Sequence, residues 1–264
     1  MAREVSSISR VGTTEPFELQ VSRGHVAYHS VVHVFGHNPD VDDGVEATVW
    51  PVSGVLLAHP ASPTIMKISS SSANDDAAGT GARTVRILGI NGTGGYTSET
   101  VTLDGQTAVN TVNTYDAIES MTVLTAGSGG VNAGIIYAGT GTVTSGVPAV
   151  KYSAIGTGDN VSLVGHWTCP TGFTGYLTAG KLTSGTTNAN QYIVGRLKLR
   201  DTNGLSYTSA IVTLADGSAW YDFTYPIKIT EGQCITATAE GNGNNNDVAS
   251  YFQIVLVRNG EALA

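Results

Sequence analysis

The sequence predicts an all-β protein with two β-sandwich (jelly-roll-like) domains behind an extended N-terminal arm that contains strands. Three observations predict this fold. Thr, Val and Ile alternate with small polar residues over long stretches, and this period of two is typical of strands. The chain has 33 glycines and only 13% charged residues, and the glycines are mixed with Ser, Thr and Asn as in turns between short strands. Runs rich in Leu, Glu, Lys and Ala, which are typical of helices, are missing.

Residues 1–41 are predicted to form a docking arm. The segment PFELQVSRGHVAYHSVVHVFGHNP has two alternating stretches around Ser-Arg-Gly, a pattern that predicts a strand, a turn and a second strand. Such an arm can add strands to the sheet edge of a neighbouring protein. We therefore expect a chain that starts at Asp42 to stay folded but to lose its oligomeric state or its attachment.

The two predicted domains span residues 42–145 and 146–264. The join between them, GTGTVTSGVPAVKYSAIGTGDN, has the Gly, Ser and Pro content of a linker. In the first domain, NGTGG after Ile90 and the pair Asp104-Gly105 predict hairpin turns. The predicted strands are 46–51, 64–69, 84–90, 99–103 and 121–124 in the first domain, and 161–168, 175–184, 192–199, 207–213, 219–225, 234–239 and 250–257 in the second.

Charge and hydropathy exclude several classes of partner. The net charge is −8 and no basic stripe occurs, so neither nucleic acid nor an anionic membrane is an expected partner. No run of eighteen apolar residues predicts a membrane span, and the first twenty residues do not resemble a signal peptide. We expect synthesis in a cytoplasm. Cys169 and Cys234 either face each other on neighbouring strands or, as we favour, are reduced core residues.

Four histidines at a spacing of four, His25, His29, His33 and His37, are the most regular titratable pattern. The β-branched and aromatic residues between them favour a strand over a helix. On a strand, successive members lie about 13 Å apart, too far for two of them to share an ion with bonds of about 2 Å. A metal is therefore expected here only on a symmetry axis between copies. Otherwise the histidines form a polar strand face or a pH-dependent subunit contact.

No catalytic constellation is found in the sequence. It has no Gly-x-Ser-x-Gly elbow and no phosphate-binding loop, and its Asp and Glu residues lie mostly in turns. His166 and Cys169 are three residues apart, which places them on opposite faces of a strand. We therefore expect no enzymatic activity, no catalytic residue and no cofactor.

Aromatic residues of the second domain offer one candidate interaction site. In WYDFTY, Trp220 and Asp222 are predicted on one strand face, with Tyr221, Phe223 and Tyr225 on the other. We expect the face with three aromatics to lie in the core and Trp220 to lie at the surface or in an interface.

Several segments resemble a family of accessory virion structural proteins of tailed bacteriophages, common among marine and freshwater phages. The segments are ATVWPVSG, SSSSANDDAAGTGARTVRILGING, SETVTLDGQTAVNT and the closing YFQIVLVRNG. The resemblance covers about Asp42 to Gly260 and does not include the histidine-rich arm. It implies an accessory component of a particle and brings no catalytic residues.

The resemblance and the residues together predict a homo-oligomeric structural protein of the virion at the tail or neck, as a collar, fibre or adaptor. Its expected partners are copies of itself and other tail, neck or capsid proteins. A capsid decoration protein is the first alternative. A module that binds a host glycan or receptor through Trp220 is the second, and a depolymerase is disfavoured because paired carboxylates and β-helix repeats are missing.

Overall fold

The computed structural model describes residues 15–186 and 188–260, and this part of the chain is nearly all β. The predicted all-β class is thus confirmed. The elements are α2 (Phe17–Ser22), β1 (His29–Val41), β2 (Ala47–Thr48), β3 (Thr64–Ser70), β4 (Ala82–Ile90), β5 (Tyr96–Thr102), β6 (Val109–Tyr115), β7 (Ala117–Ala126), β8 (Ile136–Thr144), β9 (Val147–Ile155), β10 (His166–Thr168), β11 (Phe173–Gly185), β12 (Ile193–Arg200), β13 (Ser206–Leu214), β14 (Gly217–Ile229), β15 (Cys234–Gly241) and β16 (Asn246–Arg258).

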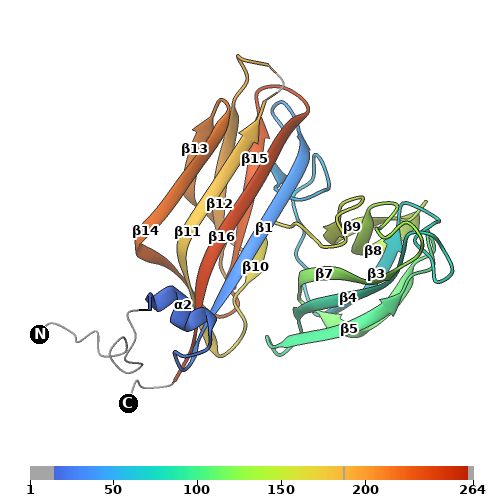
Figure 1. Cartoon of the computed structure of the whole chain (residues 1–264), viewed down its shortest axis with the longest axis horizontal. Coiled ribbons are helices and arrows are strands. Elements are labelled where there is room, and N and C mark those ends of the chain that lie inside the picture. The colour runs from blue at the N-terminus through green and yellow to red at the C-terminus, as the bar shows by residue number, and fades with distance from the viewer. Residues whose placement is uncertain (1–14, 187, 261–264) are drawn as a thin grey trace, which may run out of the picture.

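The strands are divided among four small sheets instead of two clear jelly rolls (Figure 1). Two sheets, β1-β16-β11-β14 and β10-β15-β12-β13 with β2 beside β15, enclose one apolar core that contains Trp167, Leu177 and Ile254. The sheets β6-β3-β8-β9 and β5-β4-β7 enclose a second core around Met66 and Ile87. We call these two parts the large unit and the small unit.

The small unit is an insertion within the large unit. Its strands, β3 to β9, lie in the chain between β2 and β10, which both pair with β15. The boundary expected between residues 145 and 146 falls inside a hairpin instead, because Thr144 pairs with Val147 around a two-residue turn. Ser145 and Gly146 both have positive φ, as a type I′ hairpin turn requires. The Gly/Ser-rich segment taken for a linker is therefore the β8–β9 hairpin.

The predicted docking arm corresponds to structure within the large unit. β1 pairs along its length with β16, from His29 opposite Val257 to Val41 opposite Asn246, so it is an edge strand of this sheet. The first predicted strand of the arm is wrong, because Phe17–Ser22 is a short helix. Pro16 precedes this helix and Glu18 lies in its first turn, both favourable at a helix start. Residues 1–14 of the predicted arm lie outside the described residues.

The two predicted hairpin turns of the small unit have different outcomes. NGTGG joins the paired strands β4 and β5, as expected. At Asp104-Gly105 the chain instead passes from β5 in one sheet to β6 in the other. Gly105 has a φ of 57° and donates its N–H to the carbonyl of Asp75, so the glycine serves a crossover between layers. Among the described residues, no helix has the length and apolar character needed to cross a membrane.

Candidate interaction surface

Exposed apolar side chains gather on β13 and β14 and on the residue before β13. Each of these strands is the edge of its sheet, so no other strand of the described residues pairs with its outer backbone groups. Tyr207 is 54% exposed, Ile211 61% and Tyr225 89%. β13 and β14 are consecutive strands at the edges of different sheets. We define the hairpin surface on them by Leu205, Tyr207, Ile211, Tyr221 and Tyr225. A cluster of this kind is typical of a protein–protein contact and is uncommon on a solvated face.

A bulge in β14 explains why Tyr225 projects into solvent. On β11 only Thr178 lies between the residues that pair with β14, whereas residues 223–226 lie between Asp222 and Ile227 on β14. Pro226 has no N–H to donate to a ladder, which favours a bulge at this position of an edge strand. The bulge breaks the period of two, and the prediction that Tyr225 lies in the core is wrong.

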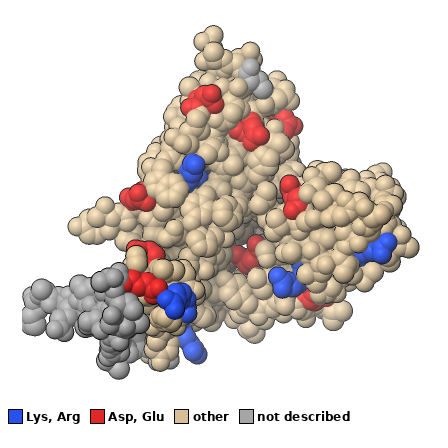
Figure 2. Space-filling model, in the orientation of Figure 1, with Lys and Arg blue, Asp and Glu red and all other residues tan. Residues whose placement is uncertain are grey.

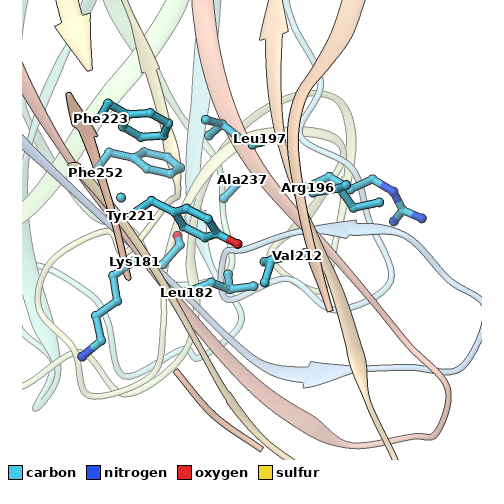
Figure 3. Close-up of a pocket in the computed structure, with 14 residues that line it drawn as sticks. Lys181, Leu182, Arg196, Leu197, Val212, Tyr221, Phe223, Ala237 and Phe252 are labelled. Atoms are coloured by element: carbon cyan, nitrogen blue, oxygen red, sulfur yellow. The ribbon is translucent and has the colours of Figure 1, made fainter. Parts of the chain in front are cut away.

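Tyr221, a member of the hairpin surface, and Phe223 lie at the edge of the large unit, between residues of its two sheets. Together with Phe252 they line an apolar cavity of about 60 Å³ (Figure 3). Phe223 packs against the core, as predicted, whereas Tyr221 is 42% exposed, so the prediction that it lies in the core is wrong. The core is thus only partly closed at this edge.

Trp220 lies on the opposite, outer face of β14, as predicted, and is 52% exposed. Here it belongs to a row that crosses all four strands of the sheet. In register, Phe35 of β1 faces Tyr251 of β16, Tyr251 faces Lys181 of β11, and Lys181 faces Trp220 of β14. The ring centroid of Tyr251 lies 5.1 Å from that of Phe35 and 6.0 Å from that of Trp220. We call Phe35, Tyr251, Lys181 and Trp220 the aromatic row.

Polar groups accompany the aromatic row. The indole Nε1 of Trp220 donates to Oδ1 of Asp222 at 2.7 Å, and the hydroxyl of Tyr251 donates to Oε1 of Gln253 at 3.2 Å. Lys181 supplies the positive charge of the row itself. Charged side chains are otherwise sparse on the face that Figure 2 shows. The row thus combines aromatic surface with a few directed hydrogen-bonding groups.

The predicted histidine set follows the edge of the same sheet. His29, His33 and His37 occupy alternate outward positions of β1, whereas His25 precedes the strand. Each has a partner of its own: His25 lies 3.9 Å from Glu15, and His29 contacts the carbonyl of Ala27. His33 contacts the hydroxyl of Tyr251 at 2.8 Å, and His37 contacts Asp247 at 3.0 Å. Within the chain they are not brought together, and a shared metal on a symmetry axis stays a prediction.

Two of the segments that carry the family resemblance contain buried residues that hold neighbouring parts of the fold together. Asp75, which the turn-like sequence around it did not distinguish, is fully buried. Its Oδ1 accepts the N–H groups of Ala82 and Ala133, both at 2.7 Å. Its Oδ2 accepts the hydroxyl of Ser70 at 2.6 Å and the N–H of Gly134 at 2.9 Å. One carboxylate therefore connects three separate segments of the small unit.

The ATVWPVSG segment has a corresponding role in the large unit. Ala47 and Thr48 form β2, and Trp50 is fully buried and donates its indole N–H to the carbonyl of Val55 at 2.9 Å. The pairing of β2 holds the start of the connector against β15, and the Trp50 hydrogen bond braces the connector itself. The two cysteines are free and buried, as we favoured. Burial raises the pKa of Cys169 to about 11, which is unfavourable for a thiolate nucleophile.

Comparisons with known proteins give little guidance. No protein-family model and no curated protein matches the chain. Among solved structures, the infectious bursal disease virus VP2 subviral particle is 11% identical, with 97% of this chain and 77% of that chain covered at a TM-score of 0.24. The infectious bursal disease virus Gt strain structure is 11% identical, with 94% and 79% covered at a TM-score of 0.24. These scores are too low to assign a common fold.

Proposed function

We propose that this protein is a non-enzymatic structural component of a tailed-phage virion that assembles as a homo-oligomer at the tail or neck. The sequence resemblance supports the tailed-phage assignment. The hairpin surface supports assembly, and it is the observation that carries the proposal. The edge strands β13 and β14, with Leu205 just before β13, expose five large apolar side chains of the hairpin surface, and a second copy of the chain would remove this area from water.

The assembly is tested by light scattering coupled to size-exclusion chromatography. The wild type is expected to elute as an oligomer, and the double variant Ile211→Ser and Tyr225→Ser as a smaller species or a monomer. Val112→Ser is the matched control, because Val112 is 88% exposed on the small unit and lies outside the hairpin surface. A monomeric wild type, or an oligomer that the double variant leaves intact, would contradict the proposal.

The position on the particle is tested separately. Quantitative mass spectrometry of purified particles should find a low copy number that matches the rotational symmetry of a tail or neck. A copy number close to that of the capsid protein, together with binding to empty heads, would instead favour a decoration protein.

A second candidate function is recognition of a host surface glycan, and the aromatic row favours it. Aromatic faces with a few directed polar groups are typical of sites for partly apolar ligands such as sugars. On a glycan array, Trp220→Ala and Phe35→Ala should each abolish a signal that Val112→Ala retains. If the wild type binds no host polysaccharide, this candidate is rejected and the assembly proposal is unaffected.

A further inference from the structure

A cluster of two imidazoles and one thiol lies where the connector to the small unit meets the large unit. His59 comes from the connector, His166 from β10 and Cys234 from β15. One ligand atom from each side chain lies within 4.8 Å of the other two. The ring centroids of His59 and His166 are 5.2 Å apart. This cluster is distinct from the histidine set of β1 and from the aromatic row.

The strand register explains why these side chains converge. On β10 and β15, Trp167 and Ile235 point into the core, so their neighbours His166 and Cys234 point outward. His166 lies opposite Thr236, and Thr168 lies opposite Cys234. The two potential ligands are thus diagonal neighbours on one sheet face. The connector, pinned by Trp50 and Leu57, covers this face and adds His59 as the third.

We propose that His59, His166 and Cys234 bind one Zn²⁺ ion, which fastens the connector to the β10–β15 sheet. Two imidazole nitrogens and a thiolate sulfur form a donor set that zinc prefers, whereas Ca²⁺ and Mg²⁺ prefer oxygen. Bonds of about 2.0–2.3 Å place zinc ligands closer together than 4.8 Å, so binding requires a small inward movement of the connector.

The surroundings of His166 fit a metal ligand. The Nδ1 atom of His166 contacts the hydroxyl of Thr236 at 2.8 Å, and Nε2 contacts that of Thr168 at 3.2 Å. A metal would replace one of these two contacts, while the other hydroxyl would keep its hydrogen bond to the ring, the usual arrangement around a ligating histidine.

The remaining coordination position faces a cavity of about 240 Å³ that Asp116 and Arg200 also line. A water molecule, or Asp116 after a movement, would complete a tetrahedral site. Arg200 lies beside Cys234 and opposes a cation, while the thiolate formed on binding and the Asp116 carboxylate offset its charge. Binding releases the thiol proton to solvent, and no redox change is involved.

The test uses the whole chain, purified with a tag that contains no histidine. Elemental analysis should find about one Zn²⁺ per chain in the wild type. Cys234→Ser and His59→Gln should lose most of it, and Cys169→Ser is the matched control that should keep it. After removal of metal with a chelator, added Zn²⁺ should raise the melting temperature of the wild type and of Cys169→Ser only.

Cobalt titration of the stripped wild type keeps the proposal testable if a variant does not fold. Co²⁺ bound to a thiolate gives a charge-transfer absorption in the near ultraviolet, which binding to the histidines of β1 alone does not produce. Its appearance supports the site. Its absence from stripped wild type that remains folded by circular dichroism would overturn the proposal, as would stoichiometric zinc that Cys234→Ser retains.

Discussion

At the scale of single residues, the buried Asp75 carboxylate determines how the small unit holds its longest irregular segment. It accepts four hydrogen bonds from three segments of the chain, of which that of Ala133 and Gly134 is distant in sequence. Gly81 lies directly against it, since a Cβ at this position would come within 2.2 Å of Oδ1. In the motif SSSSANDDAAGTGAR, the loop thus folds around the side chain of Asp75.

Asp75→Asn should destabilise the small unit by about 2–4 kcal/mol, because the amide would turn a donor toward buried N–H groups. The matched control is Asp76→Asn, whose side chain accepts only an exposed hydrogen bond from Ala78. Chemical denaturation measures both free energies of unfolding. Equal effects of the two variants would contradict the assigned role of Asp75.

A second single-residue prediction concerns the contact between the units. The part-buried Glu119 of β7 accepts the N–H of Thr168 of β10 at 3.1 and 3.2 Å through its two oxygens. Burial raises the pKa of Glu119 to about 8, against the ordinary 4.5. A carboxyl with a raised pKa favours the folded state below its ordinary pKa, and this contribution is lost as the pH rises through about 8.

Glu119→Gln should therefore stabilise the protein at pH 8 by about 1–3 kcal/mol and change it little at pH 4. Glutamine keeps an acceptor for Thr168 and removes the charge. Melting temperatures of wild type and variant, measured across this pH range, give the difference in stability at each pH. His59 and His166 titrate in both proteins, so their effect is removed when the two are compared. A constant difference at all pH values would show that the charge of Glu119 does not matter.

At the scale of elements, β1 determines whether the large unit can close. Val34 and Val41 of β1 belong to the core, and the strand covers β16 along its length. The sequence led us to expect that a chain starting at Asp42 stays folded. The pairing predicts the opposite, because this truncation leaves β16 with an open edge and opens the core.

Circular dichroism and thermal melting decide between these expectations. A chain that starts at Glu15 should melt like the wild type, and a chain that starts at Asp42 should lose the large unit or aggregate. If the chain that starts at Asp42 retains native strand content and cooperative melting, β1 is not needed for folding. That result would support the prediction that residues 1–41 form a docking arm.

The strands that were predictable from sequence are those with a half-buried, alternating pattern. β3, β4, β11, β12, β13, β15 and β16 lie close to their expected ranges. β6, β8 and β9 were not predicted, because Gly, Asn and Thr residues interrupt the alternation of apolar and polar side chains in them. In β6 the apolar Val112 is also exposed instead of buried. The surface position of Trp220 follows from alternation alone. Its partners Tyr251 and Phe35 do not, because only the pairing of β1, β16, β11 and β14 brings them into one row.

At the scale of the whole molecule, the insertion makes the two units separable in folding. The small unit has its own core, and residues 156–163 run along β7, where Val161 pairs with Thr122 and Val123 donates to the carbonyl of Asn160. Residues 63–164 expressed alone should therefore fold and unfold in one cooperative transition. Calorimetry measures this, and a fragment without a heat-absorption peak would show that the small unit requires the large one.

The topology also fixes how the molecule bears mechanical load. The first residue of β1, His29, lies opposite Val257 near the end of β16, so both strands leave the large unit at the same end (Figure 1). Tension applied through these two points would unzip the β1–β16 ladder one hydrogen bond at a time, which requires far less force than shearing a whole ladder at once. The small unit lies outside this line of force and would remain folded while the large unit unfolds.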